Sequence, residues 1–147
     1  MTASVGVRVS SVPSRAATAV CDTHALLYHA GRDRRLGRRA AALFAACDAG
    51  EAILYVPIAV LWEISLLTRR RRIDLGRSLA AFADDLFSNP AYHPLALGVE
   101  QVIIAHEHRP NADPFDALIV AAARLLDLPL VTRDEDIIES GQVRTLW

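Results

Sequence analysis

The sequence predicts an α/β fold with a central parallel sheet of four to five strands flanked by helices. The first reason is the order of its patterns, because short apolar runs alternate with stretches of helical periodicity along the 147 residues. The second reason is that the run 52–56 is apolar throughout, as in strands buried on both faces of a parallel sheet. The third reason is that this length suits one domain with one core.

Strands and helices alternate from the start of the predicted domain. Residues 18–22 form a short apolar run that ends in an Asp, which we interpret as a strand, and helical spacing continues over 23–30. A second helix is expected over 36–50, where apolar residues recur three and four positions apart. Gly50 is a typical residue at the end of such a helix.

The middle of the chain predicts a strand followed by two helices. The strand 52–56 precedes Pro57, a residue that suits the first turn of a helix. We therefore expect a helix over 58–72, and the arginines in its last turn suit the negative end of the helix dipole. Another helix is expected to follow over 73–88.

The second half of the chain continues this alternation. Its strongest helix signal is 113–127, because Asp113 is a good N-cap and Pro114 is tolerated at the first helical position. The other strands are expected over 93–97, 128–132 and 143–147, and the other helices over 98–106 and 134–140. This order predicts right-handed crossovers between parallel strands.

Composition excludes several kinds of protein. All 16 basic residues are Arg and none is Lys, which excludes P-loop nucleotide hydrolysis, Schiff-base catalysis and kinase-type phosphoryl transfer. No window of about 20 residues lacks charge, so no membrane span is expected. Cys21 and Cys47 form no zinc or disulfide pattern, which favours a reducing cytoplasm. Residues 1–17 lack the apolar run of a secretory signal and are interpreted as a flexible extension of a single domain, 18–147.

Acidic residues follow the predicted strands or open the predicted helices. In a parallel sheet, ligands bind beyond the carboxyl ends of the strands, so these acids are expected to meet at one edge. The acids are Asp22, Glu63, Asp113, Asp116 and Asp134. Four of them have a structural alternative, as N-caps that contribute about 1 kcal/mol each or, for Asp116, as an acid in a first helical turn.

Glu63 is the acid that capping does not explain. It lies among apolar neighbours, where an unpaired buried carboxylate costs several kcal/mol. An ion pair with Arg69–Arg72, or a bound metal, would remove that cost. Because the acids include no His or Cys ligand pattern, they fit a hard cation such as Mg²⁺ or Mn²⁺, which predicts metal-assisted cleavage of a phosphodiester.

Four segments resemble, in order and spacing, the four acidic motifs of the PIN-domain nucleases. They are CDTHALLY at 21–28, VLWEIS at 60–65, DPFDALIVAAA at 113–123 and LVTRDEDI at 130–137. Over about 18–147, the chain is similar to the VapC-type toxins of bacterial type II toxin–antitoxin pairs. The resemblance implies a PIN-like three-layer fold and a homodimeric, Mg²⁺- or Mn²⁺-dependent endoribonuclease. Such an enzyme hydrolyses phosphodiester bonds in a structured cellular RNA of the bacterial cytoplasm and is silenced by a cognate antitoxin protein.

The resemblance also implies a set of site residues. The matches to the four motif acids are Asp22, Glu63, Asp116 and Asp134. By the resemblance these are catalytic residues and metal ligands, and Asp113 is an additional acid that would extend the ligand set. Thr23 and Thr132 match the polar residues that flank the first and last motifs and are expected to orient carboxylates or water. The extension 1–17 and Asp136 depart from the family pattern.

The net charge of -1 means that RNA binding must depend on local basic patches. Arg69–Arg72 form one such patch and the arginines between 32 and 39 form another, although both are equally interpretable as solvated helix ends. His24 is near enough to Asp22 in sequence to approach a substrate, but a surface or packed role is the simpler interpretation. The aromatic residues Trp62, Trp147, Tyr28 and Tyr55 are either contacts of an antitoxin or core residues.

Other functions stay open at this point. A catalytically silent PIN-like module would bind RNA or protein without cutting it, although such a module need not retain all four acids. A structure-specific DNA nuclease or another phosphohydrolase would use the same acids, but the chain is small and lacks long insertions. A receiver-type phosphoacceptor domain would use a Lys, which is absent. The preference for RNA over DNA therefore rests on the resemblance.

Overall fold

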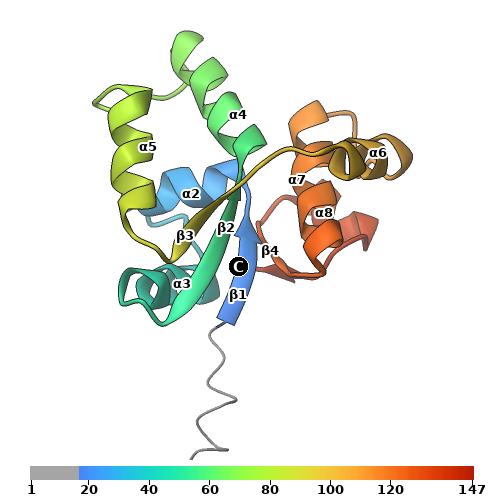
Figure 1. Cartoon of the computed structure of the whole chain (residues 1–147), viewed down its shortest axis with the longest axis horizontal. Coiled ribbons are helices and arrows are strands. Elements are labelled where there is room, and N and C mark those ends of the chain that lie inside the picture. The colour runs from blue at the N-terminus through green and yellow to red at the C-terminus, as the bar shows by residue number, and fades with distance from the viewer. Residues whose placement is uncertain (1–16) are drawn as a thin grey trace, which may run out of the picture.

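The computed structural model describes residues 17–147, which form a five-stranded parallel sheet with helices on both sides (Figure 1). The strands are β1 (Ala17–Cys21), β2 (Ala52–Pro57), β3 (Tyr92–Leu95), β4 (Leu130–Val131) and β5 (Thr145–Leu146). The helices are α2 (Thr23–Ala30), α3 (Arg38–Asp48), α4 (Ile58–Arg69), α5 (Leu79–Ser88), α6 (Val99–Glu107), α7 (Pro114–Leu126) and α8 (Glu135–Ser140). The predicted α/β fold with a central parallel sheet is confirmed.

The strand order places a crevice between β1 and β4. The sheet runs β3-β2-β1-β4-β5, and every neighbouring pair is parallel. The chain moves outward from β1 through β2 to β3 and then returns to the other side of β1 with β4. Ligands bind at such a reversal in parallel sheets, beyond the carboxyl ends of the two central strands. Cys21 pairs with Val131, so the residues that follow these two strands are neighbours at that edge.

The core lies on the central strands. Val20, Leu54, Val56 and Leu130 are fully buried, and each such side chain stabilises the fold by about 1.5–3 kcal/mol. The helix α7 packs against β1, α4 and α6, and its buried face is rich in Ala. These small side chains let the helix lie close to its neighbours and place its first turn at the crevice.

The helices α4 and α5, which flank the segment Arg69–Arg72, are shorter than the spacing of apolar residues predicted. The element α4 ends before the predicted 58–72 does, and α5 begins later than the predicted 73–88, so both predicted boundaries were wrong. The intervening sequence favours a turn, because the Gly76 amide donates a hydrogen bond to Asp74 at 2.8 Å and Gly76 has a φ of 70°. Local turn chemistry therefore outweighs the apolar spacing here.

The expected extension over 1–17 lies outside the described residues, except for Ala17, which is the first residue of β1. Ala17 pairs with Ala52 of β2, so β1 is part of the sheet from the first described residue onward. Within residues 17–147, no helix is long and apolar enough to cross a membrane.

Candidate active site

Two acids follow adjacent strands at the carboxyl edge of the sheet. Asp22 follows β1, is 8% exposed, and caps α2 by accepting a hydrogen bond from the Ala25 amide at 2.8 Å. Asp134 follows β4 and caps α8. The buried Thr132 connects them, because its hydroxyl accepts a hydrogen bond from the Asp134 amide at 3.1 Å and bonds to the Asp22 carboxylate. Capping and site geometry are thus compatible, since each cap fixes the direction of its carboxylate.

Glu63 reaches the same edge from α4. Its carboxylate accepts a short hydrogen bond from the hydroxyl of Thr23, the first residue of α2. Thr23 is only 2% exposed, so this donor is held in place by the packing of α2. Within residues 17–147, no arginine lies within ion-pair distance of Glu63, so the alternative of a salt bridge to Arg69–Arg72 was wrong.

The first turn of α7 supplies the remaining two acids. Asp113 is the N-cap and accepts hydrogen bonds from the amides of Phe115 at 2.8 Å and Asp116 at 3.3 Å. The side-chain amide of Asn111 donates to Asp116 at 2.9 Å, and its oxygen accepts from the Asp113 amide at 2.8 Å. The loop before α7 therefore holds the Asp116 carboxylate from one side.

These elements enclose a pocket of about 280 Å³, which we call the carboxylate pocket. Its lining residues are Asp22, Thr23, His24, Tyr28, Glu63, Asp113, Asp116, Arg133 and Asp134. All five predicted acids are among them, so the structure brings the expected carboxylates together. Asp136, by contrast, lies exposed on α8. The catalytic role of the five acids stays a prediction.

Burial raises the pKa values of three acids in this pocket. It is the largest cause of the raised pKa of Asp116, about 7, and nearby carboxylates act in the same direction. Burial also raises the pKa values of Asp22 and Glu63, although hydrogen bonds from Thr132 and Thr23 lower them. A bound cation would favour the charged forms of these acids.

The carboxylate oxygens of this pocket suit a hard cation, because they are the ligands that Mg²⁺ and Mn²⁺ prefer. Nevertheless, in the described part of the chain no three His, Cys, Asp or Glu side chains are grouped tightly enough to hold a metal ion. The carboxylates of Glu63 and Asp116 instead accept hydrogen bonds from Thr23 and Asn111. Each of these hydrogen bonds engages one carboxylate oxygen, Oε1 of Glu63 and Oδ2 of Asp116, so the other oxygen of each group remains available to a cation.

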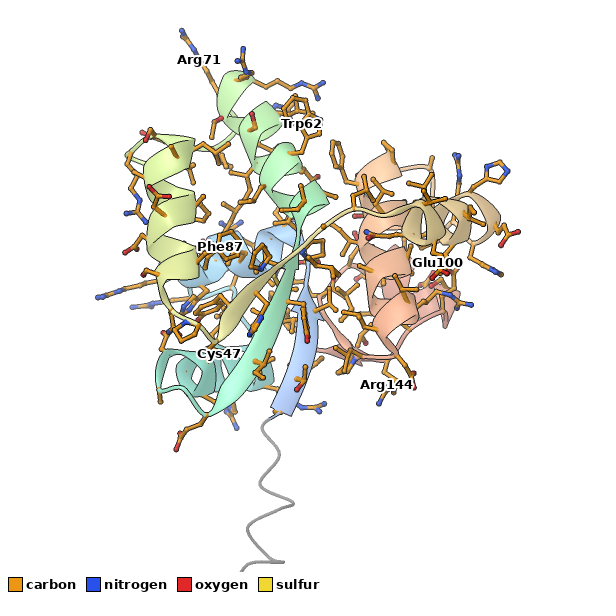
Figure 2. The ribbon with its side chains drawn as sticks, viewed as in Figure 1. Cys47, Trp62, Arg71, Phe87, Glu100 and Arg144 are labelled. Atoms are coloured by element: carbon orange, nitrogen blue, oxygen red, sulfur yellow. The ribbon has the colours of Figure 1, made fainter. Side chains whose placement is uncertain are left out.

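The other residues singled out in the sequence take different positions. His24 is exposed, as the surface interpretation expected, and it also lines the carboxylate pocket. The lining residues of this pocket do not include Arg69–Arg72, and Arg71 extends away from the body of the molecule at the end of α4 (Figure 2). Thr23 donates a hydrogen bond to Glu63 and Thr132 bonds to Asp22, and the orienting role of these two hydroxyl groups stays a prediction.

Sequence reasoning missed two residues that contact the site. Asn111 was assigned only to a loop, although an Asn two residues before an N-cap Asp is a typical turn signal that would have indicated its hydrogen bonds. Arg133 stands between Thr132 and Asp134 at the end of β4, and this position alone placed it at the edge where ligands bind. In the structure it donates a hydrogen bond to the hydroxyl of Tyr28 at 3.0 Å.

A comparison with protein-family models decides the relationship of this chain. The model described as the PIN domain matches residues 19–141. The chain belongs to the PIN domain family. The resemblance carried by the four acidic motifs is thereby confirmed. A comparison with curated proteins finds no match to the sequence.

Several solved structures have a similar fold, and one of them is a toxin–antitoxin complex. VapBC2 from Rickettsia felis, bound to a DNA fragment from its promoter, has a TM-score of 0.63 at 13% identity, covering 88% of this chain and 97% of that chain. FitAcB from Neisseria gonorrhoeae has a TM-score of 0.60 at 16% identity, with coverages of 87% and 96%. A toxin–antitoxin complex from Klebsiella pneumoniae has a TM-score of 0.55 at 18% identity, with coverages of 85% and 94%. At these identities the likeness shows the shared fold.

Proposed function

We propose that this PIN domain is a Mg²⁺- or Mn²⁺-dependent endoribonuclease that acts as the toxin of a toxin–antitoxin pair. The observation that carries the proposal is the carboxylate pocket, where five acids from four segments meet and burial disfavours the ionisation of Asp22, Glu63 and Asp116. Membership of the PIN domain family supports a nuclease, and the fold shared with a solved toxin–antitoxin complex supports a toxin. The substrate would be a structured RNA of the bacterial cytoplasm.

In this mechanism, Asp22, Glu63, Asp116 and Asp134 would hold the cation, and Asp113 would extend the ligand set. When bound, Mg²⁺ or Mn²⁺ would supply activation of water and neutralisation of the charge that develops on the phosphate. The hydroxyl groups of Thr23 and Thr132 direct the carboxylates of Glu63 and Asp22.

The proposal includes two protein partners. One is a cognate antitoxin that silences the enzyme, and the other is a second copy of the same chain in a homodimer. Both follow from the similarity to the VapC-type toxins, and one structural neighbour is itself a toxin–antitoxin complex.

A catalytically silent PIN module is the second candidate. The observation that favours it is that, within residues 17–147, the acids are not grouped for metal binding as they stand. A silent module would bind RNA or protein through the same surface and leave the phosphodiester intact. The two candidates therefore differ in whether a cation binds to the five acids and whether RNA is cut.

The deciding experiment measures thermal unfolding of the full chain with increasing Mn²⁺ or Mg²⁺ at neutral pH. A cation that binds only the folded chain stabilises it by about 2.7 kcal/mol at about 100 times its Kd. We expect this stabilisation in the unaltered chain and expect Asp116→Asn to abolish it. Incubation with total bacterial RNA in the same buffers then shows whether cation binding is accompanied by cleavage.

The matched control is Asp127→Asn, which removes the same charge from the other end of α7. This control is expected to respond to the cation as the unaltered chain does. Absence of stabilisation and of RNA cleavage in the unaltered chain would contradict the proposal and leave the silent module. Stabilisation that persists in Asp116→Asn would place the cation outside the carboxylate pocket.

A further inference from the structure

A larger depression adjoins the carboxylate pocket at α2. It has a volume of about 580 Å³ and is lined by α2, the loop after it, the segment between α4 and α5, and α5 itself. Its lining contains three arginines, Arg35, Arg72 and Arg77, and two acids, Asp33 and Asp74, so we call it the basic cleft. His24 and Tyr28 line both the basic cleft and the carboxylate pocket, so these two side chains form the boundary between them.

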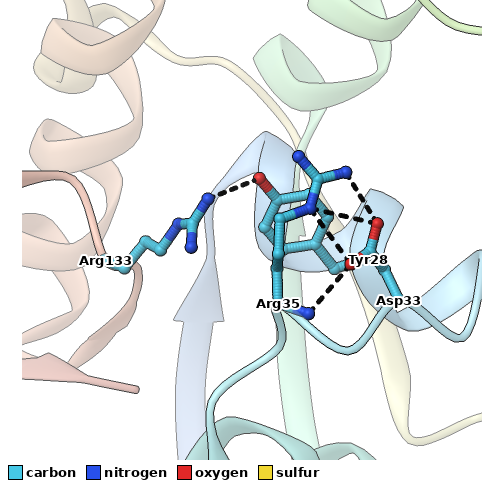
Figure 3. A network of polar contacts seen from close by, with 4 residues as sticks. All are labelled: Tyr28, Asp33, Arg35 and Arg133. Carbon is cyan, nitrogen blue, oxygen red and sulfur yellow. Dashed lines mark hydrogen bonds and ion pairs between the residues drawn. The ribbon is translucent and has the colours of Figure 1, made fainter.

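Tyr28 holds two guanidinium groups at this boundary (Figure 3). Its hydroxyl accepts a hydrogen bond from Nη2 of Arg133 at 3.0 Å, and Cζ of Arg133 lies 5.2 Å from the centre of the ring. The Cζ atom of Arg35 lies 4.6 Å from the same centre. Because Tyr28 is only 8% exposed, its ring is a fixed platform whose face attracts both cations.

The two arginines differ in how their charge is compensated. Arg35 makes a forked ion pair with Asp33, in which Nη2 lies 2.7 Å from Oδ2 and Nε lies 3.0 Å from Oδ1. Arg133, by contrast, makes no ion pair with any residue from 17 to 147, although it borders a pocket lined by five acids. The Tyr28 hydroxyl takes one of the five N–H donors of a guanidinium, and the others are available to a ligand.

The opposite side of the carboxylate pocket has a different character. A groove of about 340 Å³ lies there between α4 and the start of α7. Its lining combines four apolar residues with two acids, Glu63 and Asp113, and one arginine, Arg70. A chain of phosphates is therefore attracted to the basic cleft rather than to this groove.

We propose that Arg133 binds a phosphate of the RNA at the edge of the carboxylate pocket, and that the strand continues past Tyr28 into the basic cleft, where Arg72 binds another phosphate. This inference rests on the proposed ribonuclease function and names the residues that hold its substrate. The planar fork of Arg133 matches phosphate oxygens, and its charge offsets the repulsion between the acids and the RNA backbone. Tyr28 keeps that fork in position and is a positioning residue.

The structure places two neighbouring arginines of the segment Arg69–Arg72 differently. Arg72 lines the basic cleft, whereas Arg71 extends away from the body of the molecule (Figure 2). Arg71 is therefore a matched control, because it is adjacent in sequence, carries the same charge and is also exposed. Arg144 is a second control, since it lines a pocket near the amino ends of β4 and β5 and donates to the Asp127 carbonyl at 2.9 Å.

The test measures binding of a fluorescein-labelled, mixed-sequence, single-stranded RNA to the full chain at several salt concentrations and constant Mg²⁺. Every protein also carries Asp116→Asn, so that the RNA stays intact. We expect Arg133→Gln to weaken binding about tenfold and to lower the slope of log K against log salt by about 0.7, the value for one phosphate contact on a single strand. Arg72→Gln is expected to lower the slope equally, and Arg71→Gln and Arg144→Gln to leave it unchanged.

A merely structural role for Arg133 predicts another result, because its guanidinium also lies 5.8 Å from the ring of Trp147. Loss of packing alone would lower the unfolding temperature and leave the salt slope unchanged. Arg133→Lys sharpens the distinction, because it keeps the positive charge but loses the planar guanidinium. We therefore expect the slope of log K against log salt to stay unchanged while the affinity for RNA falls. The inference is overturned if Arg133→Gln keeps the original slope, or if Arg71→Gln lowers it as much as Arg72→Gln does.

RNA cleavage by the unaltered chain separates this inference from the function on which it rests. If the unaltered chain cleaves RNA and Arg133→Gln keeps the original salt slope, only the inference about Arg133 and the basic cleft fails. If the unaltered chain neither binds nor cleaves RNA, the ribonuclease function and the inference fail together.

Discussion

Two pockets at opposite ends of the sheet differ in how their charges are satisfied. The carboxylate pocket lies at the carboxyl ends of β1 and β4, and a larger one, the far pocket, lies near the amino ends of β4 and β5, with volumes of about 280 and 500 Å³. In the far pocket, Arg124 donates to the Gln142 carbonyl and Arg144 to the Asp127 carbonyl, each at 2.9 Å. In the carboxylate pocket, no ion pair within residues 17–147 compensates the five acids.

This difference shows that volume is a poor guide to the functional site of this molecule. The charges of the far pocket are satisfied by the fold itself, so the pocket needs no ligand. In the carboxylate pocket, burial and neighbouring carboxylates raise the pKa values of Asp22, Glu63 and Asp116, so the charged forms of these acids destabilise the folded chain unless a ligand offsets their charge. The site is therefore identified by uncompensated charge at the edge of the sheet where ligands bind.

The largest difference between the pockets is expected in RNA cleavage. Asp116→Asn removes one charge from the carboxylate pocket and should lower the cleavage rate at least about a hundredfold, because a bound cation contributes several kcal/mol of charge stabilisation. Asp127→Asn removes one charge from the far pocket, at a φ of 54° that Asn accepts, and should leave the rate unchanged. Cleavage of total bacterial RNA, followed on gels, measures both rates. Equal rates for the two variants would contradict the distinction between the pockets.

A smaller effect is expected when an orienting hydroxyl is removed. Thr23→Val keeps the shape of the side chain but removes the donor to Glu63, and we expect the affinity for Mn²⁺ to fall by roughly tenfold to a hundredfold. Thr68→Val is the control, since its hydroxyl donates to the Ser65 carbonyl within α4 at 2.7 Å. Titration calorimetry with Mn²⁺ measures both affinities. An unchanged affinity in Thr23→Val would show that this hydroxyl does not support cation binding.

The smallest effect concerns stability without added cation. The pKa of Asp116 in the folded chain, about 7, lies above the ordinary Asp value of 3.8, so the folded chain binds this proton more tightly than the unfolded chain does. Stability contributed by this group therefore falls as the pH rises from about 4 to about 7 and stays low above that range. Asp116→Asn cannot ionise, so in EDTA it should unfold at a higher temperature than the unaltered chain at about pH 8, and this advantage should vanish near about pH 4.

Calorimetric scans across this pH range check the prediction, with Asp127→Asn as the control, because it keeps Asp116 and should lose stability with rising pH as the unaltered chain does. Saturating Mg²⁺ should reverse the order at about pH 8, because the unaltered chain then gains the stabilisation that the variant has lost. A constant difference between Asp116→Asn and the unaltered chain at every pH would contradict the raised pKa of Asp116.

The sequence predicted the alternation of strands and helices because each element depends on local spacing of apolar residues. It also placed the five acids near one edge, because caps and strand ends are local features that the parallel sheet aligns. The turn between α4 and α5 was missed, since apolar spacing over 73–88 outweighed the turn residues Asp74 and Gly76. Arg133 was missed although its position after β4 placed it at the ligand-binding edge, and no local pattern indicated that it would meet Tyr28.

The sequence by itself determined which side chains leave the strands at the carboxyl edge, because Asp22, Thr132 and Asp134 are neighbours of strand ends that any parallel sheet brings together. Only the tertiary structure decided that Thr23 meets Glu63 across 40 residues and that Arg133 meets Tyr28 across 105 residues. These contacts depend on how α2 and α4 pack over the sheet after each crossover. No local pattern specifies that packing, because it results from the shapes of side chains distant in sequence.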